Sequence, residues 1–212
     1  MLFAEEYAGL LLVVHTVVAV ALVGATTHLV LWMRGFPRGR FERIRAVRKF
    51  AVIAAGLYVL SMLIGNVIYP VYKVRVRAEF LDRPTELVRE YRQRSEARYQ
   101  VAERYQANAE RLGQPGADPA VLGDGAAISV PRDLPQRAAK VARWFDVKEH
   151  WVSLGMALSL ACAVILTTWN PKRHGRSIAA IAFLMALGAA VASWLGAIIG
   201  LVVASYRSIG GL

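Results

Sequence analysis

Four long apolar runs constrain the fold of this chain more strongly than any other feature of its sequence. They cover residues 7–33, 50–72, 147–169 and 178–206. Each run matches or exceeds the roughly 20 apolar residues that an α-helix needs to cross a ~30 Å hydrocarbon layer. Hydrophobic residues make up 56% of the chain, against roughly 45–50% in soluble domains. The sequence therefore predicts an all-α fold, an integral membrane four-helix bundle with multi-pass topology.

The charges between these runs predict the orientation of the chain in the membrane. Residues 34–49 hold seven Lys and Arg against one Glu, and the connection at residues 170–176, NPKRHGR, is also basic. Short cytoplasmic loops collect Lys and Arg, so both connections are expected on the cytoplasmic side. Both termini and residues 74–146 are then expected outside, in a bacterial inner membrane. Topology thus explains the net charge of +11, and no nucleic-acid partner is expected.

The segment between the second and third runs predicts a water-facing insertion that is largely helical. It holds 15 basic and 12 acidic residues between Lys73 and Glu149, and long segments cross a membrane largely regardless of charge. Residues 84–112 contain no Gly, and their only Pro stands at the start, where a helix tolerates it. The eight Gly and Pro of residues 113–136 predict an irregular loop.

Three parts are therefore expected along the chain. Residues 1–73 hold the first two transmembrane helices and the basic cytoplasmic loop, residues 74–146 form the extracytoplasmic insertion, and residues 147–212 hold the last two transmembrane helices. A second helix of the insertion is expected to start near Asp133, with Pro135 in its first turn.

Local signals predict where two of the transmembrane helices begin or end. Asp146 is followed three residues later by Glu149, which is the spacing of a reciprocal N-terminal cap. The third transmembrane helix is therefore expected to begin at Asp146, which makes His150 a first-turn residue. Pro70 is expected to kink or end the second helix, because proline removes a backbone donor.

Four histidines are the candidates for site chemistry. The cores of the four predicted spans contain no Lys, Arg, Asp or Glu, which disfavours ion transport, whereas neutral imidazole is a usual ligand of haem iron and other metals. His15 and His150 lie toward the outer ends of the first and third helices, and His28 and His174 toward the inner ends. We expect His15 and His150 to be the axial ligands of one haem b and the candidate metal ligands. His28 would serve a second haem, and His174 is the weakest candidate.

This layering resembles the plan of membrane b-type cytochromes, in which one helix gives a histidine to each of two stacked haems. The resemblance implies electron transfer as the function. Thirteen residues separate His15 from His28, which corresponds to about 20 Å of rise and about 140° of rotation around the helix. The two rings therefore cannot both face one neighbouring helix closely.

Each histidine also has a structural interpretation. His15 would form a hydrogen bond across a helix interface, as buried polar groups in membrane bundles do. His28 would belong to a local polar cluster with Thr26 and Thr27. His150 would anchor its helix at the level of the lipid headgroups, and His174 would be a solvated cation.

Small residues repeat along the last run at every fourth position. They are Gly188, Ala192, Gly196 and Gly200. Such a face lets helix backbones approach closely in lipid, so it predicts packing within the bundle or against other membrane subunits. Tyr58, Asn66 and Tyr69 are the residues of the second helix that would contact a quinone headgroup.

These observations favour a membrane-embedded b-type haem subunit that transfers electrons between a quinone pool and an extracytoplasmic redox partner, as part of a larger complex. The alternative is a non-redox structural or assembly subunit whose external insertion docks a partner. A small transporter is disfavoured, because inverted repeats are absent. The sequence contains no Gly-rich phosphate loop, paired cysteines or HExxH motif, so an electron-transfer or anchor subunit is favoured over a self-contained enzyme.

Overall fold

The computed structural model of the chain describes residues 5–113 and 130–206, with the side chains of residues 171–175 excepted. All elements in this part are helical. Four of the helices are long and apolar enough to cross a membrane, over Ala8–Arg38, Ile44–Leu81, Leu134–Thr168 and Arg176–Tyr206. The predictions of an all-α, multi-pass membrane protein are confirmed at this level.

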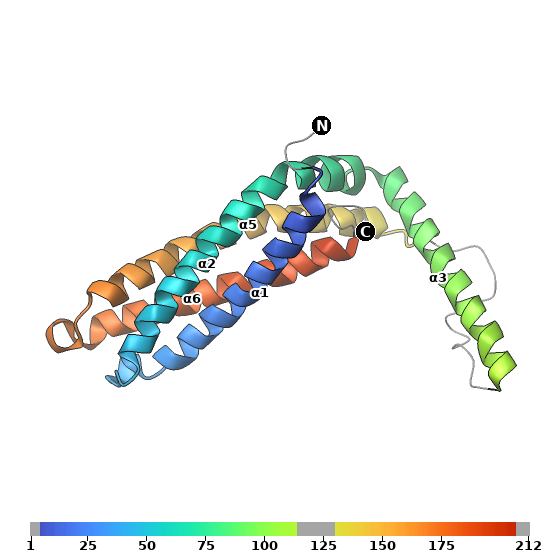
Figure 1. Cartoon of the computed structure of the whole chain (residues 1–212). Helices are drawn as coiled ribbons and strands as arrows, with labels where there is room; N and C mark the ends of the chain where they lie inside the picture. Colours follow the sequence, from blue (N-terminus) through green and yellow to red (C-terminus); the bar gives the residue numbers. More distant parts are fainter. Residues whose placement is uncertain (1–4, 114–129, 207–212) are drawn as a thin grey trace. The chain divides into compact units, whose positions relative to one another are not determined.

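The chain divides into two compact units. The four-helix unit comprises Met1–Val76 and Val141–Leu212, and the insertion unit comprises Arg77–Lys140. In the four-helix unit, α1 contacts both α2 and α6, and the helices run side by side (Figure 1).

Helix α1 (Ala8–Met33) and helix α2 (Ile44–Val71) are joined by a short connection that includes the 3-10 turn η1 (Phe36–Arg38). The turn ends at Gly39, whose φ of 80° lies in the left-handed region that favours glycine. The first helix matches its prediction to within one residue. The second begins six residues before the expected Phe50, so part of the basic segment is helical.

Pro70 lies inside α2 rather than at its end. The helix continues for one residue and then changes to the π-helix η2 (Tyr72–Leu81). Proline removes a backbone donor, and irregular helix geometry is common next to it. The expected break at Pro70 is therefore a change of helix type.

The third transmembrane helix begins earlier than predicted. Helix α5 runs without interruption over Leu134–Thr168, so the expected second insertion helix and the third transmembrane helix are one element. The cap predicted at Asp146 is wrong, because neither Gly nor Pro occurs in residues 136–154 to stop a helix that has already begun. The start near Asp133 was predicted correctly.

Helix α6 (Pro171–Tyr206) also begins earlier than the predicted residue 178. Pro171 suits a first helical turn, where the missing amide donor costs nothing. The expected loop NPKRHGR is therefore largely helical, and the connection from α5 consists of Trp169 and Asn170.

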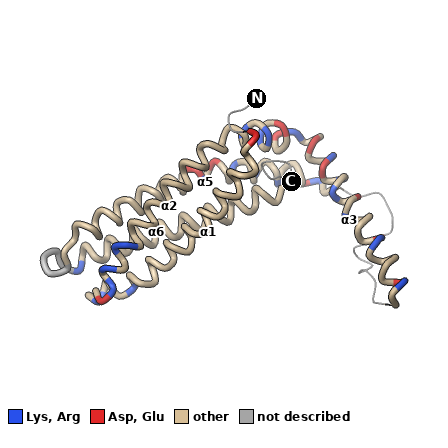
Figure 2. The backbone as a smooth tube through the Cα atoms, viewed as in Figure 1, with Lys and Arg blue, Asp and Glu red and all other residues tan. Residues whose placement is uncertain are grey.

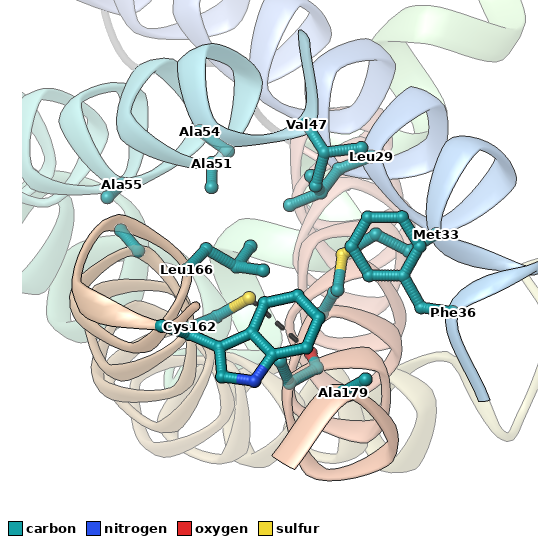
Figure 3. Close-up of a cluster of buried hydrophobic side chains, with 14 of the residues drawn as sticks. Leu29, Met33, Phe36, Val47, Ala51, Ala54, Ala55, Cys162, Leu166 and Ala179 are labelled. Carbon is teal, nitrogen blue, oxygen red and sulfur yellow. Dashed lines mark hydrogen bonds between the residues drawn. The ribbon is translucent and has the colours of Figure 1, made fainter. Parts of the chain in front are cut away.

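The largest apolar core lies in the half of the four-helix unit that holds the two basic connections. It joins Leu29 and Met33 of α1, Val47 of α2 and Leu166 of α5 (Figure 3). Small residues let the helices approach here, and the Cys162 thiol donates a hydrogen bond to the carbonyl of Ala182 at 3.4 Å. This free cysteine is a buried packing residue.

The insertion unit is built around helix α3 (Pro84–Leu112), whose bounds equal the predicted ones. Pro84 stands in the first turn, and Gly113 ends the helix in the left-handed conformation with φ 61°. Ala102 and Ala109 of this helix are buried, whereas Tyr105 is exposed.

Candidate functional site at the insertion end

The four-helix unit has two ends that differ in charge and in the residues that form them. The basic end holds residues 34–49 and the connection between α5 and α6. The insertion end holds the start of α1, the end of α2 and the part of α5 that begins at Val141. Figure 2 shows long stretches without charge in the four helices, and Lys and Arg gathered at the basic end.

The basic end is closed by an arginine and an aromatic cluster. The Arg48 guanidinium of α2 donates hydrogen bonds to the carbonyls of Leu166, at 2.8 Å, and Trp169, at 2.5 Å. These carbonyls belong to the end of α5, where a helix lacks its own donors. Phe36 and Phe41 pack against the Trp169 indole, with ring centroids 6.2 and 5.0 Å away. Arg48 therefore has a structural role.

The middle of the unit is held by hydrogen bonds between helices. The hydroxyls of Thr26 in α1 and Ser193 in α6 lie 2.9 Å apart. Trp194 donates its indole N–H to the Thr27 hydroxyl at 3.1 Å. The Tyr58 hydroxyl of α2 donates to a backbone carbonyl of α6. Polar pairs of this kind fix the relative position of membrane helices.

The small residues of α6 face α5 of the same chain. A Cβ atom on Gly188 would lie 2.9 Å from a Leu158 methyl carbon, and one on Gly196 would lie 3.1 Å from a Val152 methyl carbon. Close approach of two helices therefore accounts for the stripe, which was one of its two expected uses. Contact of this face with another membrane subunit stays a prediction.

The insertion end contains an inward-facing cation that the sequence did not predict. Lys148 of α5 points toward α6, where its Nζ lies 3.3 Å from the position that a Cβ on Gly200 would take. Its Nζ also lies 5.4 Å from the centroid of the Phe145 ring, which stacks on Tyr72 at a centroid distance of 3.8 Å. The predicted cap at Asp146 placed Lys148 in a first turn, whereas it lies in the middle of the continuous helix α5.

His15 of α1 lies close to this cation. The charge of Lys148 acts on the imidazole, which also approaches the backbone of Ser61 in α2. Its Cε1 lies 3.5 Å from the position of a Cβ on Gly65. The Nδ1 atom of His15 is buried and has no hydrogen-bond partner among residues 5–113 and 130–206. Of the three histidines whose side chains the structure describes, His15 is the one with an unsatisfied buried nitrogen.

His150 lies on the opposite side of α5 from Lys148. Two positions correspond to about 200° around a helix, and the His150 side chain is exposed. Its Nδ1 pairs with the Asp146 carbonyl of its own helix at 2.9 Å. It is a mid-helix residue, so its predicted position in a first turn is wrong.

The two expected haem ligands differ in depth as well as in direction. The pairs Thr26–Ser193 and Gly196–Val152 set the register of the helices. By this register His150 lies about six residues, or ~9 Å, nearer the middle of the unit than His15. The structure therefore gives the two imidazoles different surroundings.

The remaining expected site residues have structural contacts. His28 packs against Trp32 and Phe50, at centroid distances of 5.7 and 6.2 Å, while its neighbours Thr26 and Thr27 face α6 instead. The three residues therefore do not form one polar cluster.

His174 lies in the first turns of α6, and its side chain is outside the described part of the structure. Three residues were expected to contact a quinone. The hydroxyl of Tyr58 is hydrogen-bonded to α6, Asn66 is exposed, and the ring of Tyr69 stacks on Tyr72. Within the described residues, no group of three or more His, Cys, Asp and Glu side chains is placed to hold a metal ion.

Comparisons of the chain with known protein families, with curated proteins and with solved structures found no match.

Proposed function

We propose that this chain is a membrane-embedded assembly subunit, whose four helices anchor the insertion unit and whose insertion unit docks a partner protein. The basic end would face the cytoplasm of a bacterial cell, and both termini and the insertion would lie outside. The ten Lys and Arg against one Glu in residues 34–49 and 170–176 support this orientation.

One face of helix α3 is the observation that supports docking most strongly. Val101, Tyr105 and Leu112 are 67%, 56% and 69% exposed. Their spacings of four and seven residues place them on one side of the helix. Aromatic and aliphatic side chains exposed together on one face are typical of protein interfaces, in which tyrosine is enriched. The buried Ala102 and Ala109 border this face on one side.

The native size of the protein tests this proposal. We would extract it mildly from its own membranes and compare the wild type with the double variant Val101→Ser/Tyr105→Ser. The control is Glu103→Ser/Ala107→Ser, which has the same spacing on another exposed side of α3. We expect a complex much larger than the 23.3 kDa chain in the wild type and the control, and its loss in the first variant. Equal sizes in all three would refute docking through this face.

A second candidate function is electron transfer through haem b, exchanging electrons with a quinone pool and an extracytoplasmic redox partner. It is favoured by His150, whose Nδ1 is held by a backbone carbonyl, the arrangement that orients an imidazole for binding through Nε2. The unsatisfied Nδ1 of His15 also favours it. Because His150 points away from Lys148 and the interior, coordination by both histidines within one chain requires a rearrangement of α5, and we rank this candidate second.

A further inference from the structure

The ammonium group of Lys148 points from α5 into the four-helix unit, where its interactions with neighbouring residues are weak. It lies between α5 and α6, where the absence of a side chain at Gly200 leaves room for it. The Phe145 ring contacts it at 5.4 Å. Glu149, an exposed neighbour in the chain, attracts it electrostatically. No ion pair or hydrogen bond joins Lys148 to another residue of the described part of the chain.

His15 adds a second nitrogen from another helix. Lys148 and His15 interact electrostatically, and the buried Nδ1 of His15 lacks a described acceptor or donor. Gly65 leaves room beside the imidazole, as Gly200 does beside the ammonium. Lys148 of α5, beside Gly200, and His15 of α1, beside Gly65, thus bring two nitrogen-bearing side chains to the insertion end of the unit. An ionisable group in this position is usually functional.

The direction of Lys148 indicates where its partner would come from. Side chains on a helix lean toward its N-terminus, which for α5 points to the insertion end. Long basic side chains near helix ends reach for the headgroup region in this way. Glu5, an acid at the same end, is already paired with Arg75 at 2.7 Å.

From this arrangement we propose that Lys148 and His15 bind a phosphate group, supplied by an anionic phospholipid at the insertion end of the four-helix unit. The ammonium provides charge and donors, and the imidazole provides a donor in the tautomer with the proton on Nδ1. The site does not depend on docking through α3, but it would compete with a haem for His15.

Thermal unfolding of the purified full chain tests the proposal. The protein would be placed in dodecyl maltoside micelles, which contain no phosphate, without and with phosphatidylglycerol, and in the same micelles with inorganic phosphate. Lys148→Met and His15→Ala would be compared with Lys49→Met, which removes one exposed cation at the basic end. The unfolding temperature of each variant in the micelles alone shows that it is folded.

We expect phosphatidylglycerol to raise the unfolding temperature of the wild type and of Lys49→Met by several degrees. In Lys148→Met at least half of this shift should be lost, and in His15→Ala a smaller part. If inorganic phosphate alone gives the Lys148-dependent shift, the site binds phosphate and the source is free anion. A shift of the same size in the wild type and Lys148→Met would overturn the proposal. So would the absence of any shift with either addition, which would leave a carboxylate of another protein as the partner.

Discussion

A cationic side chain points into the four-helix unit at each of its ends, and the two cations have different interaction partners. At the basic end, the guanidinium of Arg48 donates to two carbonyls at the end of α5. At the insertion end, the ammonium of Lys148 contacts an aromatic ring and the space beside a glycine. The guanidinium of Arg48 satisfies backbone carbonyls, whereas the ammonium of Lys148 lacks a hydrogen-bond acceptor among the described residues.

This difference separates a structural charge from a candidate binding charge. A satisfied arginine at the end of a helix substitutes for the donors that the helix lacks, and its removal leaves unpaired carbonyls. An unsatisfied lysine in a membrane span costs free energy, and its removal should cost little. Loss of Arg48 should therefore lower the free energy of unfolding, whereas loss of Lys148 should leave it unchanged or raise it slightly.

The largest expected difference between the two ends is their side of the membrane. Single cysteines would replace Arg45 at the basic end and Arg104 in the insertion unit, both of which are exposed. A membrane-impermeant maleimide applied to intact cells should label the cysteine at position 104 and leave the one at 45 unlabelled. The wild type controls for Cys162, which is buried. Labelling at position 45 alone would reverse the orientation.

Both ends depend on the close packing in the middle of the unit. A Cβ on Gly155 would lie 2.5 Å from the Tyr58 hydroxyl oxygen and 2.7 Å from the Ala192 Cβ. We expect Gly155→Leu to lower the free energy of unfolding in micelles by about 3 kcal/mol. Gly56→Leu, at a position with open space around it, is the control and should change it little. Equal effects of the two changes would refute the packing described here.

Arg48→Ala tests the structural cation of the basic end. It leaves the carbonyls of Leu166 and Trp169 without their donor, so the free energy of unfolding should fall by about 2 kcal/mol. Arg45→Ala removes an exposed cation from the same end and should cost less than about 0.5 kcal/mol. Reversible unfolding in mixed micelles measures both. A similar small cost for the two would show that Arg48 does not hold the end of α5.

Lys148→Met should have the smallest effect on the free energy of unfolding, and unlike Arg48→Ala it should not lower it. In micelles without phosphatidylglycerol we expect the free energy of unfolding to stay unchanged or to rise by up to about 1 kcal/mol, because the variant removes an unpaired charge from a membrane span. The same unfolding measurement applies. A loss of the size expected for Arg48→Ala would place Lys148 among the structural cations and remove the contrast between the ends.

The sequence predicted the parts of the fold that local signals control. The length of its apolar run located α1, and Pro84 and Gly113 bounded α3 correctly. The start near Asp133 was predicted, but the continuity of α5 was missed because Asp146 and Glu149 have the spacing of a cap, although no residue before them ends the helix that begins at Leu134.

The candidate site was less predictable than the fold. The inward direction of Lys148 depends on the register of α5 against α6 and on the room beside Gly200, which no pattern within one helix contains. For the same reason the sequence could not show that His150 faces away from the interior.

An absorption spectrum tests most directly whether this chain is an assembly subunit rather than a redox subunit. The protein would be purified from cells replete in haem, and reduced-minus-oxidised spectra would be recorded for the wild type and for His15→Ala, His150→Ala and His174→Ala. We expect a folded wild-type protein without a b-type band. A reduced b-type band in the wild type that is lost in both His15→Ala and His150→Ala but kept in His174→Ala would contradict this and establish the haem subunit instead.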